Sequence, residues 1–249
     1  MTLQATWPAA YALRQFAELD STNEEARRLA ASGIEGPIWI RADRQTSGRG
    51  RRGNVWVSTE GNLAATLLLR PDRPTAICAQ LSFVAALAAS DMIAAHAPMA
   101  TVRVKWPNDV LVDEKKIAGI LLESAQGRGA RPDWLGVGIG VNLVSRPDDT
   151  EFPAIALSEL GVRIPEAAEA LTALAIYWDR WHQVWLERGF APLRDAWLAR
   201  AARLGERIRA RFAHGETRGV FEGIDESGAL ILREHHGAAR AIPAGEIYF

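Results

Sequence analysis

The pattern of apolar and polar positions predicts a chain of short strands and longer helices. Apolar runs of about four to eight residues between turn residues are typical of buried strands. On this basis strands are expected at about residues 38–40, 55–57, 63–69, 102–106, 110–112, 116–123 and 134–144. The Glu60-Gly61-Asn62 segment suits a tight turn, so residues 55–57 and 63–69 are expected to pair as a hairpin. Residues 1–19 are weakly patterned and predict no element.

Two helices are expected in the first half of the chain. Ser21 and Thr22 are each followed three positions later by a glutamate, which is a capping-box pattern. Gly33 suits the end of the helix that follows. Thr75 is expected to cap a second, apolar helix that runs to about residue 95. The polar residues that interrupt this second helix favour a buried position over a membrane span.

Two more helices are expected at about residues 167–188 and 190–204. The first of these carries apolar and aromatic residues at helical spacing, namely Leu171, Leu174, Trp178, Trp181 and Trp185. Such a stripe is far more typical of a hydrophobic core than of a cofactor site. We therefore expect this pair of helices to cover the back of the sheet.

The pattern changes at Gly205, where short strands separated by turns replace the longer elements. Strands are expected at residues 207–213, 217–224, 229–233 and 238–242. This spacing is typical of a small antiparallel barrel or sheet of about 45 residues. A unit of this size has little stability of its own, so it is expected to lean on the preceding domain. The domain boundary is therefore expected between residues 204 and 205.

The composition limits the classes of function. The chain has 249 residues, which allows one large domain, or a moderate domain with a small one. Its net charge of −1 gives no overall attraction to nucleic acid or to an acidic membrane, so any anion site must be local. Cys78 is the only cysteine, which excludes an internal disulfide and fits a reducing compartment. No signal-peptide pattern opens the sequence, so the cytoplasm is the expected location.

Residues 46–53, which we call the Gly/Arg loop, hold three glycines and three arginines. Glycine lets the backbone approach a ligand closely, and arginine presents donors that fit carboxylates and phosphates. The loop lacks the P-loop pattern. It meets the Gly-x-Gly-x-x-Gly spacing but lies between two expected strands rather than before a helix. From these residues alone, a flexible hairpin connection and an RGG-like segment that binds nucleic-acid phosphates both remain open.

A second candidate is the segment from Lys105 to Asp109. The expected strand delivers Lys105, and Pro107 then interrupts its pairing. Asn108 and Asp109 follow at the strand end, although Pro-Asn-Asp taken alone is more often a turn. Lys116 opens the returning strand and is expected close to Lys105 or Asp109 if the two strands pair. A hairpin lysine is more often solvated.

Alternating glycines mark the expected strand at 134–144. Gly136, Gly138 and Gly140 leave one face without side chains, as where a ligand or a backbone approaches closely. Asn142 ends this run, and taken alone it is a turn residue. Elsewhere in the sequence no histidine forms a metal-site spacing with a cysteine or acidic residue, and no Gly-x-Ser-x-Gly elbow supports a serine hydrolase.

Taken together, these segments resemble the biotin–protein ligases, that is, the biotin–[acetyl-CoA-carboxylase] ligases. The segments that carry the resemblance follow the family's order along the chain: Ser21-Thr22-Asn23, residues 45–53 with Trp56, residues 104–109, residues 116–121, residues 138–142 and residues 223–232. The Gly/Arg loop resembles the biotin-binding loop of that family, and Lys105 to Asp109 with Lys116 is similar to its second signature. The combination is specific where each piece alone is not.

The resemblance implies an α/β fold in which helices flank a mixed sheet, related to the catalytic core of class II aminoacyl-tRNA synthetases. A small SH3-like β-barrel would follow, with residues 1–204 as the catalytic domain and residues 205–249 as the barrel. The implied reaction joins biotin and Mg-ATP into biotinyl-5′-AMP and pyrophosphate. The biotin then moves to one lysine of a biotin carboxyl carrier protein, part of acetyl-CoA carboxylase or a related carboxylase.

By family position, the resemblance also implies three sets of site residues. Biotin would be bound by Ser21, Thr22, Gln45, Gly48, Arg49, Lys116 and Gly119. ATP would be bound by Arg51, Arg52, Trp56, Asn108 and Asn142. Arg51, Lys116 and Asp109 would be catalytic, because cations must offset the repulsion between the biotin carboxylate and the α-phosphate. Asp109 is also the candidate acceptor for the proton of the incoming lysine and the candidate ligand of Mg²⁺.

The resemblance leaves the partners partly open. About 20 residues precede Ser21, too few for a helix-turn-helix domain, so neither a repressor role nor a DNA partner is expected. No membrane partner is expected, and both a monomer and a homodimer remain open.

Two alternative functions compete with the biotin ligase. A lipoate or octanoate ligase belongs to the same superfamily, but the Gly/Arg loop and the Lys105 to Asp109 segment favour biotin. A nucleic-acid-binding module that uses the Gly/Arg loop and the small β-domain belongs to another class of protein. The near-neutral charge and the absence of aromatic platforms beside the loop disfavour it.

Overall fold

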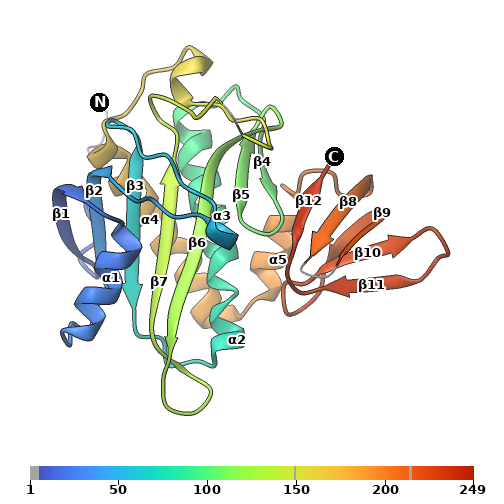
Figure 1. The fold of residues 1–249 in the computed structure, drawn as a ribbon, viewed down its shortest axis with the longest axis horizontal. Coiled ribbons are helices and arrows are strands. Elements are labelled where there is room, and N and C mark those ends of the chain that lie inside the picture. The colour runs from blue at the N-terminus through green and yellow to red at the C-terminus, as the bar shows by residue number, and fades with distance from the viewer. Residues whose placement is uncertain (1–5, 149, 213–214) are drawn as a thin grey trace.

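In the computed structural model, which describes residues 6–148, 150–212 and 215–249, the chain forms two β-sheets, and helices pack against the larger one (Figure 1). Seven strands form the larger sheet in the order β1-β2-β3-β7-β6-β5-β4. Their bounds are β1 Ala12–Leu19, β2 Ile38–Gln45, β3 Leu63–Leu69, β4 Val102–Lys105, β5 Asp109–Val112, β6 Lys115–Gln126 and β7 Pro132–Val141. β1 pairs with β2 in parallel, and the other neighbouring pairs are antiparallel. The expected mixed sheet of an α/β fold is therefore confirmed.

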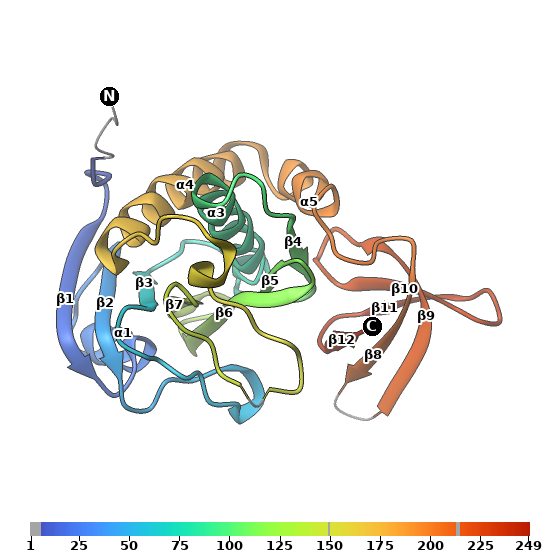
Figure 2. The same ribbon diagram turned by 90° about the horizontal axis from the view of Figure 1, so that it is seen from above.

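Helices cover both faces of the larger sheet (Figure 2). α3 (Leu81–His96) and α4 (Ala167–Arg188) pack together on one face, and α1 (Thr22–Ala31) packs on the other. The shorter elements are α2 Thr75–Cys78, α5 Ala191–Leu198 and the 3₁₀ turns η1 Arg51–Gly53 and η2 Leu157–Leu160. The alternation along β2 shows the two faces, because Trp39 enters the core with α3 and α4 whereas Ile38 and Ile40 enter the one under α1.

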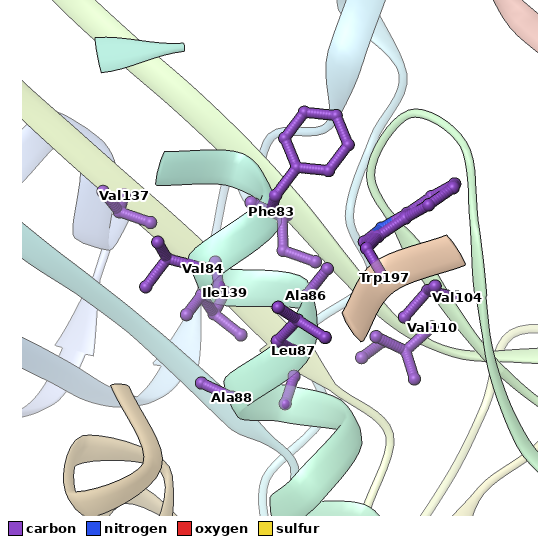
Figure 3. Packing of buried hydrophobic residues seen from close by; sticks show 14 of the residues in the cluster. Phe83, Val84, Ala86, Leu87, Ala88, Val104, Val110, Val137, Ile139 and Trp197 are labelled. Carbon is purple, nitrogen blue, oxygen red and sulfur yellow. The ribbon is translucent and has the colours of Figure 1, made fainter. Parts of the chain in front are cut away.

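The main hydrophobic core lies between the sheet and α3 and α4. α3 is buried along most of its length, which explains why it is apolar on all sides. In Figure 3, Val84 of α3 lies beside Val137 and Ile139 of β7. Residues 75–96 are long and apolar enough to cross a membrane, but 72% of the apolar window in them is buried inside the protein. The expectation of a buried helix is confirmed.

The aromatic stripe of α4 belongs to the same core, as the sequence predicted. Trp178 is fully buried and meets Trp39 edge-on, with the ring centroids 6.2 Å apart. Trp181 is partly buried and donates its indole N–H to Asp91 at 2.8 Å. The stripe therefore holds the back of the sheet and takes no part in a ligand site.

The sequence analysis missed one strand and predicted one hairpin that does not form. β1 was missed because, as an edge strand with most side chains exposed, it carries no alternating apolar pattern. The hairpin of residues 55–57 with 63–69 does not form, because β3 pairs with β2 on one side and β7 on the other. Val55 instead forms a bridge to Arg49, and both Val55 and Val57 are exposed.

Helix boundaries differ from the expected ones where capping was invoked. α1 begins at Thr22 as predicted, but its N-cap Ser21 makes no side-chain cap hydrogen bond, so the capping-box interpretation was wrong. Thr75 opens the short α2 after Pro74, and α3 begins separately at Leu81. α5 ends at Leu198, earlier than expected.

Five antiparallel strands form the second sheet, in the order β11-β10-β9-β8-β12. Their bounds are β8 Arg207–Phe212, β9 Gly215–Ile224, β10 Leu230–Glu234, β11 Ala239–Ile242 and β12 Glu246–Tyr248. The first four were expected, although Ala213, predicted to end the first, lies outside the described residues; β12 was missed because it is so short. The two sheets are joined at Trp106, whose indole N–H donates to Gly228 O at 3.0 Å. β12 lies beside the Lys105 to Asp109 segment, since Nζ of Lys105 is 5.9 Å from the centroid of the Tyr248 ring.

Candidate active site

A cavity of about 360 Å³ opens on the face of the larger sheet that α1 covers. Its walls come from the start of α1, the Gly/Arg loop, the ends of β4 and β5, the middle of β6 and β7, and the second sheet through Glu246 and Tyr248. Because these elements are far apart in the sequence, the cavity forms only when both sheets are in place. A cavity with mixed apolar and polar walls is the usual form of a small-molecule site.

The floor of the cavity is the glycine face of β7. A Cβ atom on Gly140 would lie 2.3 Å from Cε2 of Trp56, and one on Gly138 would lie 2.2 Å from Oδ1 of Asn23. Both distances are too short for any side chain. A close approach to this face is present, but the approaching groups are two side chains, the Trp56 indole and the Asn23 amide, rather than the expected ligand or backbone.

One end of the cavity carries an uncharged hydrogen-bond network. Oε1 of Gln45 accepts from the backbone N–H of Thr22 at 2.8 Å and from its hydroxyl at 3.1 Å. The hydroxyl of Thr66 lies 2.8 Å from Oγ1 of Thr22 and 2.5 Å from Oδ1 of Asn23. Thr22, Asn23 and Thr66 are all buried. This end is therefore built for an uncharged polar group, and its donors and acceptors are fixed before any ligand arrives.

The other end of the cavity carries charge. Nζ of Lys116 lies 2.7 Å from Oδ1 of Asp109, and Nζ of Lys105 lies 3.5 Å from Oδ2 of the same carboxylate. Nζ of Lys105 also lies 4.1 Å from the ring centroid of Phe152, a cation–π contact. The proximity of Lys116 to Asp109 that the sequence predicted is confirmed. Two cations share one anion, so the cluster has an excess positive charge that suits an anionic ligand.

Burial shapes the protonation of this cluster. Burial of the Asp109 carboxyl would raise its pKa, but the ammonium groups of Lys116 and Lys105 outweigh that effect and hold the pKa below its ordinary value. Burial lowers the pKa of Lys105, and the negative charge of Asp109, which favours the ammonium form, offsets this only in part. Asp109 is therefore a carboxylate at neutral pH.

The Gly/Arg loop reaches both ends of the cavity. Near the uncharged end, Arg49 pairs with Glu24 at 3.2 Å and with Glu123 at 3.1 Å. Near the charged end, Nη1 of Arg51 donates to Oδ1 of Asn108 and to the backbone oxygen of Gly245, both at 3.2 Å. Burial lowers the pKa of Arg51, but an arginine remains charged at any ordinary pH.

Asn142 has an incomplete set of partners. It is buried, and its Nδ2 donates to Ile155 O at 3.2 Å, but its Oδ1 has no partner among the described residues. A buried acceptor without a partner costs free energy unless a ligand or water completes it. Asn142 lines the cavity, so a donor on a ligand is a suitable partner.

The structure brings most of the predicted site residues to this one cavity. Those that line it are Ser21, Thr22, Gln45, Arg49, Arg51, Trp56, Asn108, Asp109, Lys116, Gly119 and Asn142. Gly48 and Arg52 do not line it. Gly48 lies against the returning arm of the loop, since a Cβ there would be 2.3 Å from Trp56 O, and Arg52 lies 3.8 Å from Glu246.

Several cavity residues were not assigned from the sequence. Asn23 could have been noticed as the neighbour of Ser21 and Thr22. Thr66, which does not line the cavity but supports Thr22 and Asn23 from behind, could have been noticed as a hydroxyl inside an otherwise apolar run. Glu246 and Tyr248 carry no signal of this kind, because a separate sheet brings them to the site.

The geometry does not fit a metal held by the protein alone. Among the described residues, no group of three or more histidine, cysteine, aspartate or glutamate side chains could hold a metal ion. Asp109, the candidate ligand of Mg²⁺, already faces two ammonium groups, and a further cation beside them would be repelled.

Comparison with known families matches both parts of the chain. Residues 16–142 match the biotin/lipoate A/B protein ligase family, and residues 204–249 match the biotin protein ligase C-terminal domain.

Individual relatives extend this likeness. The chain is 49% identical to the biotin–[acetyl-CoA-carboxylase] ligase of Paracoccus denitrificans over 94% of this chain and 98% of that one. It is 34% identical to the bifunctional ligase/repressor BirA of Bacillus subtilis over 91% of this chain and 70% of that one. The biotin protein ligase of Aquifex aeolicus, solved with biotin and ATP, superimposes with a TM-score of 0.82 at 30% identity, covering 95% of this chain and 97% of that one.

Proposed function

From the premise that the chain belongs to the biotin/lipoate A/B protein ligase family, we propose that it is an ATP-dependent biotin–protein ligase. It activates biotin with ATP to biotinyl-5′-AMP and transfers the biotin to one lysine of a biotin carboxyl carrier protein. The acceptor belongs to acetyl-CoA carboxylase or a related carboxylase, in line with the name of the Paracoccus relative. The proposed location of the reaction is the cytoplasm.

The polarity of the cavity is the observation that carries this proposal. The uncharged network lies over Gly138, and the charged cluster lies beside Gly119, which pairs with Gly140 of β7 and with Asp109 of β5. Biotin has a matching polarity, with an uncharged ureido ring at one end and a carboxylate at the other. Thr22 and Gln45 would meet the ureido group, and the carboxylate would then point to Lys116.

The charged cluster supplies what the first chemical step requires. Attack of a carboxylate on the α-phosphate brings two anions together, and fixed cations lower the energy of that approach. Lys116 and Arg51 take this role because both line the cavity, one on β6 and the other on the loop. Arg52 joins them when phosphate replaces its present neighbour Glu246. No covalent intermediate with the enzyme is needed, because holding the two reactants together does much of the work.

Two further residues match the nucleotide. The free acceptor Oδ1 of Asn142 suits the exocyclic amine of adenine, and Asn108 suits the ribose or phosphates beside Arg51. Trp56, which lies against Gly119 and Gly140, packs over the bound ligand and keeps water from the reactive anhydride. Mg²⁺ would arrive on the triphosphate, which supplies oxygens of the kind it prefers.

The second step needs a base for the incoming lysine. Asp109 is ionised at neutral pH and lies at the cavity wall, so it is the proposed acceptor of a hydrogen bond from the amine and then of its proton. The division of labour follows the two sheets. Residues 1–204 hold biotin and ATP, and residues 205–249 close the charged end through β12.

Pyrophosphate exchange tests the proposed function. The purified protein should exchange labelled pyrophosphate into ATP when biotin is present, and it should then label a biotin carboxyl carrier domain. Lipoate and octanoate serve as matched controls, since the alternative ligases would use them. Exchange driven by lipoate or octanoate but not by biotin would overturn the assignment, as would tight salt-sensitive binding of random RNA without any binding of biotin.

A further inference from the structure

Glu123 of β6 does not line the cavity, yet one oxygen of its carboxylate joins two residues of the cavity wall. Its Oε2 accepts from Nδ2 of Asn23 at 2.7 Å and from Nη2 of Arg49 at 3.1 Å. Asn23 stands at the start of α1 and Arg49 stands in the Gly/Arg loop, so Glu123 ties the loop to the helix. The chemistry proposed above gives this residue no role.

On its inner side, the Glu123 carboxylate accepts a hydrogen bond from Asn23, the last member of the uncharged network. Asn23 is buried, lies on Gly138, and places its Oδ1 2.5 Å from the hydroxyl of Thr66. That hydroxyl lies 2.8 Å from Oγ1 of Thr22, which in turn donates to Gln45. An unbroken line of hydrogen bonds therefore runs from Glu123 to the residues proposed for the ureido group. A ligand that orders Thr22 and Gln45 also orders Asn23, because the Thr66 hydroxyl links Thr22 to Asn23.

On its outer side, Glu123 holds the loop by a weak tie. Arg49 lies between the carboxylates of Glu24 and Glu123 and has 42% of its side chain exposed. Exposed ion pairs contribute little each, so this tie breaks easily. The two ends of the loop have other ties, since the backbone N–H of Ser47 donates to Asp20 O at 2.8 Å and Arg51 donates to Asn108 and Gly245, so Arg49 is the tie near the uncharged end of the cavity. The part of the loop around Arg49 can therefore be held against α1 and β6 and can still move away from them.

We propose that Glu123 is a positioning residue that couples biotin binding to closure of the Gly/Arg loop. It fixes Asn23 under the biotin end of the cavity and draws Arg49 down over it, so that each event favours the other. This coupling is reciprocal: a closed loop retains biotin and biotinyl-5′-AMP, and bound biotin keeps the loop closed. The inference rests on the proposed ligase function, and it adds a residue that touches neither substrate.

Two amide variants weaken the outer tie to Arg49 and leave the inner tie to Asn23 in place. Glu123→Gln keeps an oxygen that can accept from Asn23 but removes the charge that attracts Arg49. Glu24→Gln is the matched control, because it removes the other carboxylate from Arg49 and does not touch Asn23. Both variants should speed the dissociation of biotinyl-5′-AMP by about two- to fivefold, the range expected when a half-exposed ion pair is lost.

A third variant breaks both ties. Glu123→Ala leaves the buried Asn23 amide without its acceptor, so the affinity for biotin measured by calorimetry without ATP should fall about tenfold. Both amide variants should lower it by no more than about two- to fivefold, the factor that loss of the loop tie alone gives when the coupling is reciprocal. Adding Glu123→Gln to Arg49→Gln should change adenylate release no further, since the two residues act on one contact.

Hydrogen exchange of the loop amides gives a readout that does not depend on catalysis. Residues 46–53 should exchange faster in Glu123→Gln and in Glu24→Gln, and biotin should slow this exchange in the wild type but not in Glu123→Ala. Wild-type loop exchange in Glu123→Gln, together with wild-type adenylate release, would overturn the coupling. So would additive effects of Glu123→Gln and Arg49→Gln. A wild-type protein without biotin-dependent pyrophosphate exchange would instead defeat the ligase assignment, because loop exchange in the variants is measured separately.

Discussion

The two ends of the cavity are built on opposite principles. The uncharged end, around Thr22, Gln45 and Thr66, has its polar groups paired with one another before a ligand arrives. The charged end, around Lys105, Asp109 and Lys116, crowds two cations onto one buried anion. The first end gains selectivity from fixed geometry, whereas the second stores an unbalanced charge that an anion relieves. In the proposed function, binding and chemistry would thereby fall to different parts of one cavity.

Removal of Lys116 should give the largest effect, and it should fall on the chemistry. Lys116→Ala takes away the cation closest to Asp109, and the loss of one group that stabilises a transition state costs about 100- to 1000-fold in rate. Biotin-dependent pyrophosphate exchange should fall by this factor while calorimetric biotin binding changes much less. A variant that exchanges at the wild-type rate would show that Lys116 is only a hairpin lysine.

Asp109→Asn should give the second-largest effect, and it should lower the free energy of unfolding as well as the reaction rate. The change leaves Lys105 and Lys116 facing each other with no anion, and breaking a buried pair from one side costs about 3 kcal/mol. Because the folded-state pKa of Asp109 is lowered, its contribution is complete above the unfolded carboxyl pKa of about 3.9 and is lost as the pH falls through the folded value.

Denaturant unfolding at several pH values measures this. The variant should be less stable than the wild type at pH 7, and the two unfolding free energies should converge in acid. A gap that stays constant down to acidic pH would mean that the ion pairs do not contribute as described.

Thr66→Val should give the smallest effect, confined to binding. The change keeps the shape of the side chain but removes the hydroxyl that links Thr22 with Asn23, at a cost of about 1–2 kcal/mol. The KM for biotin should rise about tenfold while kcat changes little. Thr66→Ser is the matched control because it keeps the hydroxyl, and it should bind biotin nearly as the wild type does. A fall in kcat with an unchanged KM would contradict the proposed separation of binding from chemistry.

The parts of the site that lie on neighbouring strands could be predicted from the sequence. Asp109 pairs with Lys105 of β4 on one side and with Gly119 of β6 on the other. The prediction that these segments pair as hairpins was therefore enough to bring the three residues together. The glycine alternation of β7 similarly predicts a face that another group approaches. In both cases the periodicity of a strand carries the information.

The other parts depend on contacts between distant segments. Nothing in the pattern of Leu63–Leu69 indicates that Thr66 meets Thr22, and nothing near Glu246 indicates that it meets the Gly/Arg loop. The failed hairpin has the same origin, because β3 prefers partners that local sequence does not specify. Packing between elements decided these features, and local propensity could not reveal them.

The contribution of β12 has a consequence for a newly made chain on the ribosome. Lys105, Asp109 and Lys116 emerge long before Glu246 and Tyr248, which complete the wall beside them. Until those residues leave the exit tunnel, the wall beside the charged cluster lacks Glu246 and Tyr248. Because synthesis follows the chain, the residues of the uncharged end emerge first, and the wall of the charged end is completed last.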